Sequence, residues 1–165
     1  MQETEKSIRR ICIASIRRHT FKPIDYPLTK IFETQYITEI DNKISSAFAH
    51  EENELPIALT QVDDKNWTLL TTQKIISNIE GKMQQAPAKN IIKWTWGNFK
   101  GYVREIVTLG RITFKDDSTL NILIETGSAS MIMIYGIRTL TGREISTADQ
   151  INKTLSRYQK RGFLE

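Results

Sequence analysis

The hydrophobic periodicity of the chain changes at Pro56, and this change limits the folds that the sequence can adopt. Before Pro56, apolar residues recur at the three-or-four spacing of amphipathic helices. After Pro56, short apolar runs are separated by polar turn residues, which is typical of antiparallel strands. The sequence therefore predicts an α+β chain in which a helical part precedes a β-rich part.

Residues 1–54 are expected to form a helical N-terminal extension. A first helix is predicted around residues 6–19, and a second, more acidic helix is predicted from Thr29 to His50. Pro23 and Pro27 separate the two helices, because two prolines four residues apart cannot lie inside a regular helix.

Residues 55–142 predict a small antiparallel β-barrel or sandwich that is closed by a C-terminal helix. Apolar runs of strand length alternate with turn residues, as in small all-β architectures. Residues 143–165 then predict a final polar helix with a basic end. The expected strands cover 56–62, 67–72, 74–80, 91–96, 102–114 and 119–125, the closing helix covers 128–141, and 82–90 is expected to be a loop.

The order of these elements resembles that of bacterial pleckstrin-homology-like (PH-like) and GRAM-like domains over residues 55–142. The segment that carries the resemblance combines Leu70-Thr71-Thr72, then Ile75-Ile76, then Gly81. The resemblance implies a barrel-like fold with a capping helix, and such folds serve lipid binding, peptide binding or structural roles. One departure concerns the first hairpin turn, which holds Asp63 and Asp64 beside a single lysine. Two carboxylates there would repel a phosphorylated headgroup, so a phosphoinositide site is not expected.

The stretch from Lys93 to Tyr102 is rich in aromatic and cationic residues. In an extended strand Ile92, Trp94 and Trp96 would share one face, and we expect that face to be buried in the core. The turn that follows could present an aromatic surface with nearby cations to a partner. The predicted binding residues are Lys93, Phe99, Lys100, Tyr102 and Arg104.

The first helix is strongly basic, and two interpretations of it stay open. It could lie on an anionic membrane, or it could dock onto the acidic second helix. Residues 23–64 carry nine acids against two lysines, which favours docking. The predicted basic surface consists of Arg9, Arg10, Arg17 and Arg18.

Catalytic and metal-binding patterns are absent from the sequence. Its two histidines, His19 and His50, lie in separate segments, and Cys12 is the single cysteine. No ligand spacing for zinc, no Gly-x-Ser-x-Gly motif and no glycine-rich phosphate loop occurs. We therefore expect neither an enzyme nor a cofactor. The weakest alternative is a hydrolase that uses His50 with the neighbouring Glu51 and Glu52.

The cysteine content and the lengths of the apolar runs favour a cytoplasmic location. A lone cysteine suits a reducing compartment, no apolar run approaches the roughly 20 residues that span a bilayer, and no secretory signal is recognisable. The leading hypothesis is a non-enzymatic binding protein that acts through protein–protein contact, for instance as an inhibitor or immunity-type partner. The alternatives are a peripheral binder of anionic lipid or another anionic ligand and, on the strength of the net charge of +4, a nucleic-acid-binding protein.

Overall fold

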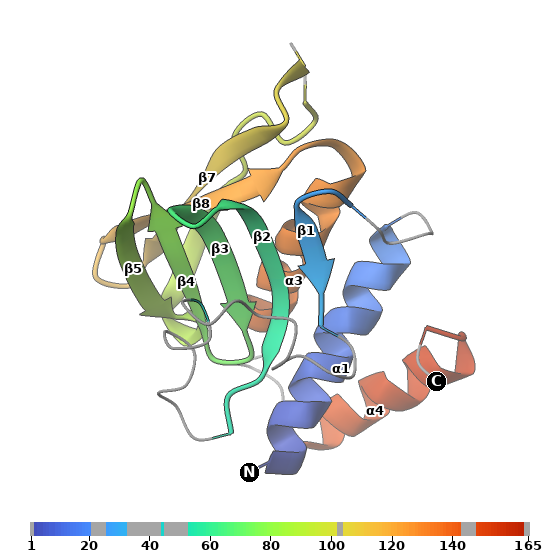
Figure 1. Cartoon of the computed structure of the whole chain (residues 1–165). Coiled ribbons are helices and arrows are strands. Elements are labelled where there is room, and N and C mark those ends of the chain that lie inside the picture. The colour runs from blue at the N-terminus through green and yellow to red at the C-terminus, as the bar shows by residue number, and fades with distance from the viewer. Residues whose placement is uncertain are drawn as a thin grey trace.

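The computed structural model describes residues 2–20, 26–32, 44, 53–101, 104–142 and 148–163 (Figure 1). It is an α+β structure with two antiparallel sheets, in the orders β1-β2-β3-β4-β5 and β6-β7-β8. The strands are β1 (Thr29–Ile31), β2 (Pro56–Asp63), β3 (Asn66–Thr71), β4 (Lys74–Ile79), β5 (Lys82–Pro87), β6 (Ile91–Thr95), β7 (Val107–Phe114) and β8 (Thr119–Glu125). The helices are α1 (Gln2–His19), α3 (Ser130–Gly142) and α4 (Ala148–Lys160), with 3-10 turns η1 (Ala88–Asn90) and η3 (Gly127–Ala129). The described strands form two separate sheets and do not close into one barrel.

The strands predicted on either side of the first turn are confirmed as the β2–β3 hairpin, and β4 follows as predicted. Asp63 closes the hairpin turn, because its Oδ1 atom accepts hydrogen bonds from the Lys65 backbone N–H (2.8 Å) and from Asn66 Nδ2 (3.0 Å). This use of an aspartate is a backbone role that turns favour.

The prediction of a loop at residues 82–90 is wrong, because the first part of this segment is strand β5. Glu80 and Gly81 both have positive φ angles, 53° and 80°. Two such residues form the turn that suits the twist of a tight hairpin, so the chain returns along β4. β5 lies at the edge of its sheet and is largely exposed, which explains its polar, loop-like composition.

The prediction that a helix begins at Thr29 is also wrong. Thr29–Ile31 is strand β1, which pairs with β2 so that Thr29 lies opposite Thr60. β-Branched residues fit a pleated surface, and pairing with the β2 edge overrides the local helical pattern. Phe32, the next residue, is buried and not helical, and the rest of the predicted helix lies outside the described residues except Ile44, which is helical and buried.

The central strands β2, β3 and β4 of the five-stranded sheet are buried on both faces. On one face Ala58, Leu70 and Ile75 belong to the main core, which includes residues of β7, β8, α1 and α3. On the other face Leu59, Leu69 and Ile76 pack with Phe32, Ile44 and Trp67. Burial on both faces accounts for the continuous apolar runs in β3 and β4.

A row of hydroxyl side chains crosses the inner face of this sheet. Thr29, Thr60, Thr68 and Ser77 lie side by side on β1, β2, β3 and β4. Thr29 Oγ1 lies 3.0 Å from Thr60 Oγ1, and Thr68 Oγ1 lies 3.2 Å from Ser77 Oγ. Thr68 Oγ1 also accepts a hydrogen bond from the backbone N–H of Leu123 in β8 (2.8 Å). The row therefore ties the second sheet to the first.

Among the described residues, α1 and α3 pack against the sheets and α4 packs on α1; Figure 1 shows α1 running next to α3 and crossed by α4. The closing helix predicted at 128–141 is confirmed as η3 followed by α3, and the final helix is confirmed as α4. Residues 143–147 of that predicted helical segment lie outside the described residues. α1 packs on α3, α4 and β2, and the acidic segment onto which it could dock lies mostly outside the described residues.

Candidate functional site

The β6–β7 hairpin presents one face to solvent and one to the core. Its register places Lys93 opposite Thr113 and Thr95 opposite Arg111. Residues directly opposite each other in an antiparallel pair share a face. Lys93, Thr95 and Arg111 are exposed, whereas Ile112 on the other face is fully buried. The pleat therefore sets two cations of this sheet toward solvent.

The predicted inward position of Ile92 is wrong. Ile91 pairs with Phe114 while Lys93 pairs with Thr113, so Ile92 is the extra residue of a β-bulge. Ile92 is 54% exposed, and Ile91 takes the buried position instead. A bulge shifts the side-chain alternation by one residue, which a strict period of two cannot anticipate.

Trp94 and Trp96 pack on the core side of the hairpin, as the sequence predicts. Both side chains are half-buried and pack against the main core. Their rings stack with a centroid distance of 5.8 Å. The exposed chemistry of this segment therefore comes from its cations and from the loop that follows.

The described parts of the loop between β6 and β7, residues 96–101 and 104–106, lie at one end of the molecule (Figure 1, yellow, top). Backbone contacts hold both of its sides. The Asn98 N–H donates to Thr108 Oγ1 (2.9 Å), and the Gly127 N–H donates to the carbonyl of Phe99 (2.8 Å). A further bond joins the Asn98 side-chain amide to Glu105 Oε2 (2.9 Å). The loop is thus fixed to the junction of β8 and η3.

The strand predicted for residues 102–114 begins only at Val107. Arg104 has a φ of 61°, which lies in the left-handed region and ends any regular strand. Arg104 therefore does not share strand alternation with Tyr102, which lies outside the described residues. Arg104 is exposed, and non-glycine residues with such backbone angles often occur at functional sites.

The other predicted binding residues lie in the same hairpin. Phe99 is half-buried. The ammonium group of Lys100 lies 6.0 Å from the centroid of the Phe99 ring. Lys93 lies on the exposed sheet face described above. The structure therefore places Lys93, Phe99, Lys100 and Arg104 on one hairpin, although on two parts of it, the sheet face and the loop.

The sequence interpretation missed the apolar part of this region. Five large hydrophobic side chains are exposed among the described residues, and three of them lie in this hairpin. They are Ile92 (54% exposed), Ile106 (70%) and Leu109 (48%). Leu109 alternates with the buried Gly110 and lies two residues before Arg111, so a correct strand start would have placed both side chains on the outer face. We define the β6–β7 surface as Ile92, Lys93, Thr95, Lys100, Arg104, Glu105, Ile106, Leu109 and Arg111.

The predicted basic surface of α1 is partly wrong. Arg9 is buried, and its Nη2 atom donates to the carbonyl oxygen of Phe32. Arg10 and Arg18 are exposed and Arg17 is half-buried. The apolar side of α1 contributes residues such as Ile8 to the core, so this side does not face solvent where a membrane could contact it.

Of the two histidines, His19 lies within the described residues. The ring of His19 stacks on the ring of Tyr135 with a centroid distance of 3.5 Å and an interplanar angle of 5°. The Cζ atom of Arg138 lies 5.2 Å from the centroid of the Tyr135 ring. His50, with its neighbouring glutamates, lies outside the described residues. In the part of the chain that the structure describes, no three His, Cys, Asp or Glu side chains gather as a metal site would require.

No described helix is both long and apolar enough to cross a membrane. No protein-family model, curated protein or solved structure matches this chain.

Proposed function

We propose that this chain is a non-enzymatic binding protein that acts through protein–protein contact at its β6–β7 surface. The observation that carries the proposal is the concentration of exposed Ile92, Ile106 and Leu109 in one hairpin. Exposed apolar side chains that gather in one region and are bordered by polar ones mark interaction sites, and this hairpin holds three of the five exposed large hydrophobic side chains among the described residues.

The charge of the surface indicates the chemistry of the partner. It contains four cations, Lys93, Lys100, Arg104 and Arg111, and one carboxylate, Glu105, which gives a formal charge of +3 (four minus one). A complementary partner would present an acidic rim around an apolar centre. The partner that fits is therefore an acidic protein surface.

The conformation of the loop supports the same proposal. Hydrogen bonds from Asn98 and Gly127 fix the loop before any partner arrives. A preorganised loop loses less conformational entropy on binding, which raises affinity.

The proposal includes the PH-like assignment of the β region. Strands β2–β5 and β6–β8 lie in two antiparallel sheets and are followed by α3, which contacts β2, β3 and β8. This order of strands and a closing helix supports the assignment, and an inhibitor or immunity-type role in the cytoplasm is the form of protein binding that we propose.

The test is affinity capture of the tagged full chain from its own source lysate after nuclease treatment, followed by binding measurements with the purified partner. The variant Arg104→Glu/Ile106→Ser should weaken binding by at least about tenfold, since central interface residues commonly contribute more than 1.4 kcal/mol. The matched control, Val62→Ser/Lys82→Glu, changes an exposed apolar residue and an exposed cation on the five-stranded sheet. It should bind as the unmodified chain does.

Three results would contradict the proposal. They are equal binding by both variants, loss of binding only in the control, and capture of no stoichiometric protein. Sedimentation with anionic vesicles that weakens as salt rises would instead favour the lipid alternative. A salt-sensitive gel shift would favour nucleic acid.

A further inference from the structure

A pocket of about 540 Å³ lies where the β3–β4 turn, β5 and η1 meet helices α1 and α3. This volume is within the range of small-molecule sites, roughly 300–1,000 Å³. The pocket shares no residue with the β6–β7 surface, and the inference drawn from it does not depend on the proposed function.

Four of the lining residues supply hydrogen-bond donors. Gln73 and Lys74 line it from the β3–β4 turn and the start of β4, Gln85 from β5, and Lys89 from η1. Two ammonium groups and two amides can all donate hydrogen bonds. None of the described residues that line the pocket carries a carboxylate. The donor set therefore suits a ligand group that accepts hydrogen bonds and carries negative charge.

Another part of the lining is apolar. Ile8 of α1 and Leu140 of α3 line it together with Ala86, Pro87 and Ala88. Ligand sites commonly combine an apolar wall with a few fixed polar groups. An acidic ligand with a compact hydrocarbon part matches both the polar and the apolar lining residues.

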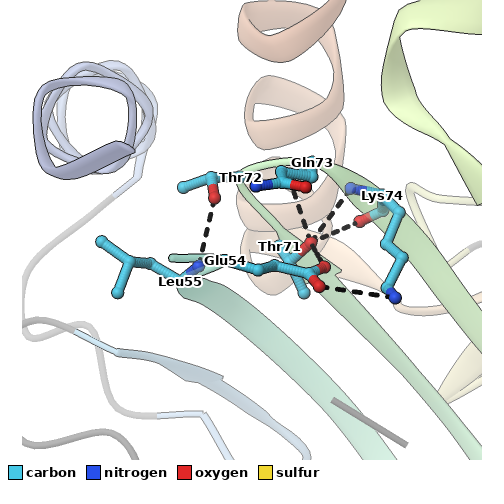
Figure 2. Close-up of polar contacts among 6 residues, drawn as sticks. All are labelled: Glu54, Leu55, Thr71, Thr72, Gln73 and Lys74. Carbon is cyan, nitrogen blue, oxygen red and sulfur yellow. Dashed lines mark hydrogen bonds and ion pairs between the residues drawn. The ribbon is translucent and has the colours of Figure 1, made fainter. Parts of the chain in front are cut away.

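Lys74 is held in place by the polar cluster drawn in Figure 2. Its ammonium lies 3.4 Å from Glu54 Oε2 in a buried ion pair. Its backbone N–H donates to Thr71 Oγ1 (3.0 Å), and the Thr71 hydroxyl donates to Glu54 Oε1. Figure 2 shows the Glu54 carboxylate between Thr71 and Lys74. Such fixed supporting contacts set the position of a binding group before the ligand arrives.

Glu54 also determines how much negative charge the pocket can accept. Lys74 and Lys89 bring two positive charges, and Glu54, behind Lys74, brings one negative charge, which leaves +1 (two minus one). A dianionic phosphate would be opposed by Glu54 at this short range. In addition, no arginine is among the described lining residues, although arginine is the preferred planar partner of phosphate.

From this geometry we propose that the pocket binds a small monocarboxylate with a compact apolar body. The carboxylate contacts Lys89 beside the buried Lys74, and the hydrocarbon part packs between Ile8 and Leu140. We assign binding to the pocket, because the Thr72 hydroxyl, the one hydroxyl among the described lining residues, accepts a hydrogen bond from the Leu55 N–H (3.1 Å) with no histidine beside it in the lining.

The experiment is calorimetric titration of the full chain with octanoate, 1-octanol and octyl phosphate. Octanoate should bind saturably with a dissociation constant of about 1 mM or below. Octanol and octyl phosphate should each bind at least about fivefold more weakly, because the first lacks the charge and the second carries too much.

Two exposed lysines supply a matched pair of variants. Lys89→Gln removes a pocket charge and should weaken octanoate binding by about fivefold or more. Lys82→Gln removes an exposed charge on the same strand–turn region outside the lining and should leave the affinity unchanged. Because both side chains are exposed, neither variant should lower the unfolding temperature.

The Glu54→Gln variant separates the charge argument from simple hydrophobic binding. It should increase the affinity for octyl phosphate more than the affinity for octanoate, since it removes the opposing carboxylate. The proposal is overturned if octanoate does not bind saturably, if Lys89→Gln binds it as tightly as the unmodified chain, or if octanol matches octanoate. Octyl phosphate binding more tightly than octanoate to the unmodified chain would overturn the monocarboxylate assignment.

Discussion

Gly136 of α3 lies so close to Leu70 of β3 that a Cβ atom on the glycine would stand 2.5 Å from Leu70 Cδ2. The same Cβ atom would lie 3.6 Å from Ile16 Cδ1 of α1. Gly136 therefore marks the point where α3, α1 and the five-stranded sheet meet. A glycine inside a helix is about 1 kcal/mol less favourable than alanine, and this close approach explains its presence.

Gly136→Ala is expected to destabilise the fold. Leu70 is fully buried, so its methyl group can move away only by disturbing its neighbours. Overpacking of about 1–3 kcal/mol exceeds the helix-propensity gain of about 1 kcal/mol, so the free energy of unfolding should fall by about 1 kcal/mol. Gly142→Ala in the same helix is the control, because nothing lies within 4 Å of its added Cβ. Urea denaturation compares the two, and equal stability of both variants would contradict the close contact.

The Glu54–Lys74 pair should show coupling in a double-mutant cycle. Lys74→Met leaves the carboxylate of a fully buried side chain without its cation and should lower the free energy of unfolding by about 3 kcal/mol. The double variant Glu54→Gln/Lys74→Met removes both charges and should lose less than the sum of the single variants, by at least about 1 kcal/mol. Additive losses in chemical denaturation would show that the two charges do not interact.

The hydroxyl row makes a separate prediction about how the sheets are joined. Thr68→Val keeps the side-chain shape but leaves the Leu123 N–H without its acceptor, so the free energy of unfolding should fall by about 1–3 kcal/mol. Ser77→Ala removes the neighbouring hydroxyl and leaves the bond from Leu123 intact, so its loss should be smaller. Hydrogen exchange at the Leu123 amide should accelerate in Thr68→Val and stay slow in Ser77→Ala.

The β7–β8 turn offers a test by pH titration. Hydrogen bonds from the Ser118 hydroxyl and from its backbone N–H hold the pKa of Asp116 below its ordinary value of 3.8. Ser118→Ala removes the hydroxyl, so the pKa of Asp116 should rise toward that value. The pKa of Asp63, lowered by the Lys65 N–H and by Asn66, should not change. Carboxyl carbon chemical shifts measure both.

The sign of the associated stability effect follows from the depressed pKa. The contribution of Asp116 is present above its unfolded pKa of about 3.9 and is lost as the pH falls through the lower folded pKa. Ser118→Ala should therefore reduce the dependence of stability on pH below about 4. An unchanged Asp116 titration in this variant would rule out the hydroxyl as the main donor.

Local patterns were sufficient to predict the elements that local contacts form. The β2–β3 hairpin, α3 and α4 follow from turn residues and from periodicity. β1 could not be predicted in this way, because Thr29 extends only by pairing with Thr60, thirty-one residues away. β5 was missed because an exposed edge strand has the polar composition of a loop.

The candidate surface was predicted in part. Lys93, Lys100 and Arg104 are exposed in one hairpin, and their cationic character is visible in the sequence. The exposure of Ile106 cannot be predicted from the sequence, because it follows from the positive φ angle of Arg104 and from the late start of β7. The pocket could not be foreseen either, since its walls come from five segments that only the tertiary fold brings together.

The strand edges described above bear on how this chain behaves at high concentration. Unprotected edges recruit strands from other molecules and lead to aggregation. Here β1 is three residues long, β5 begins with Lys82 and ends with Pro87, and β6 is interrupted by the bulge at Ile92. Strand-to-strand growth is thus discouraged at three edges. Self-association, where it occurs, should proceed through side chains and should disperse without unfolding the protein.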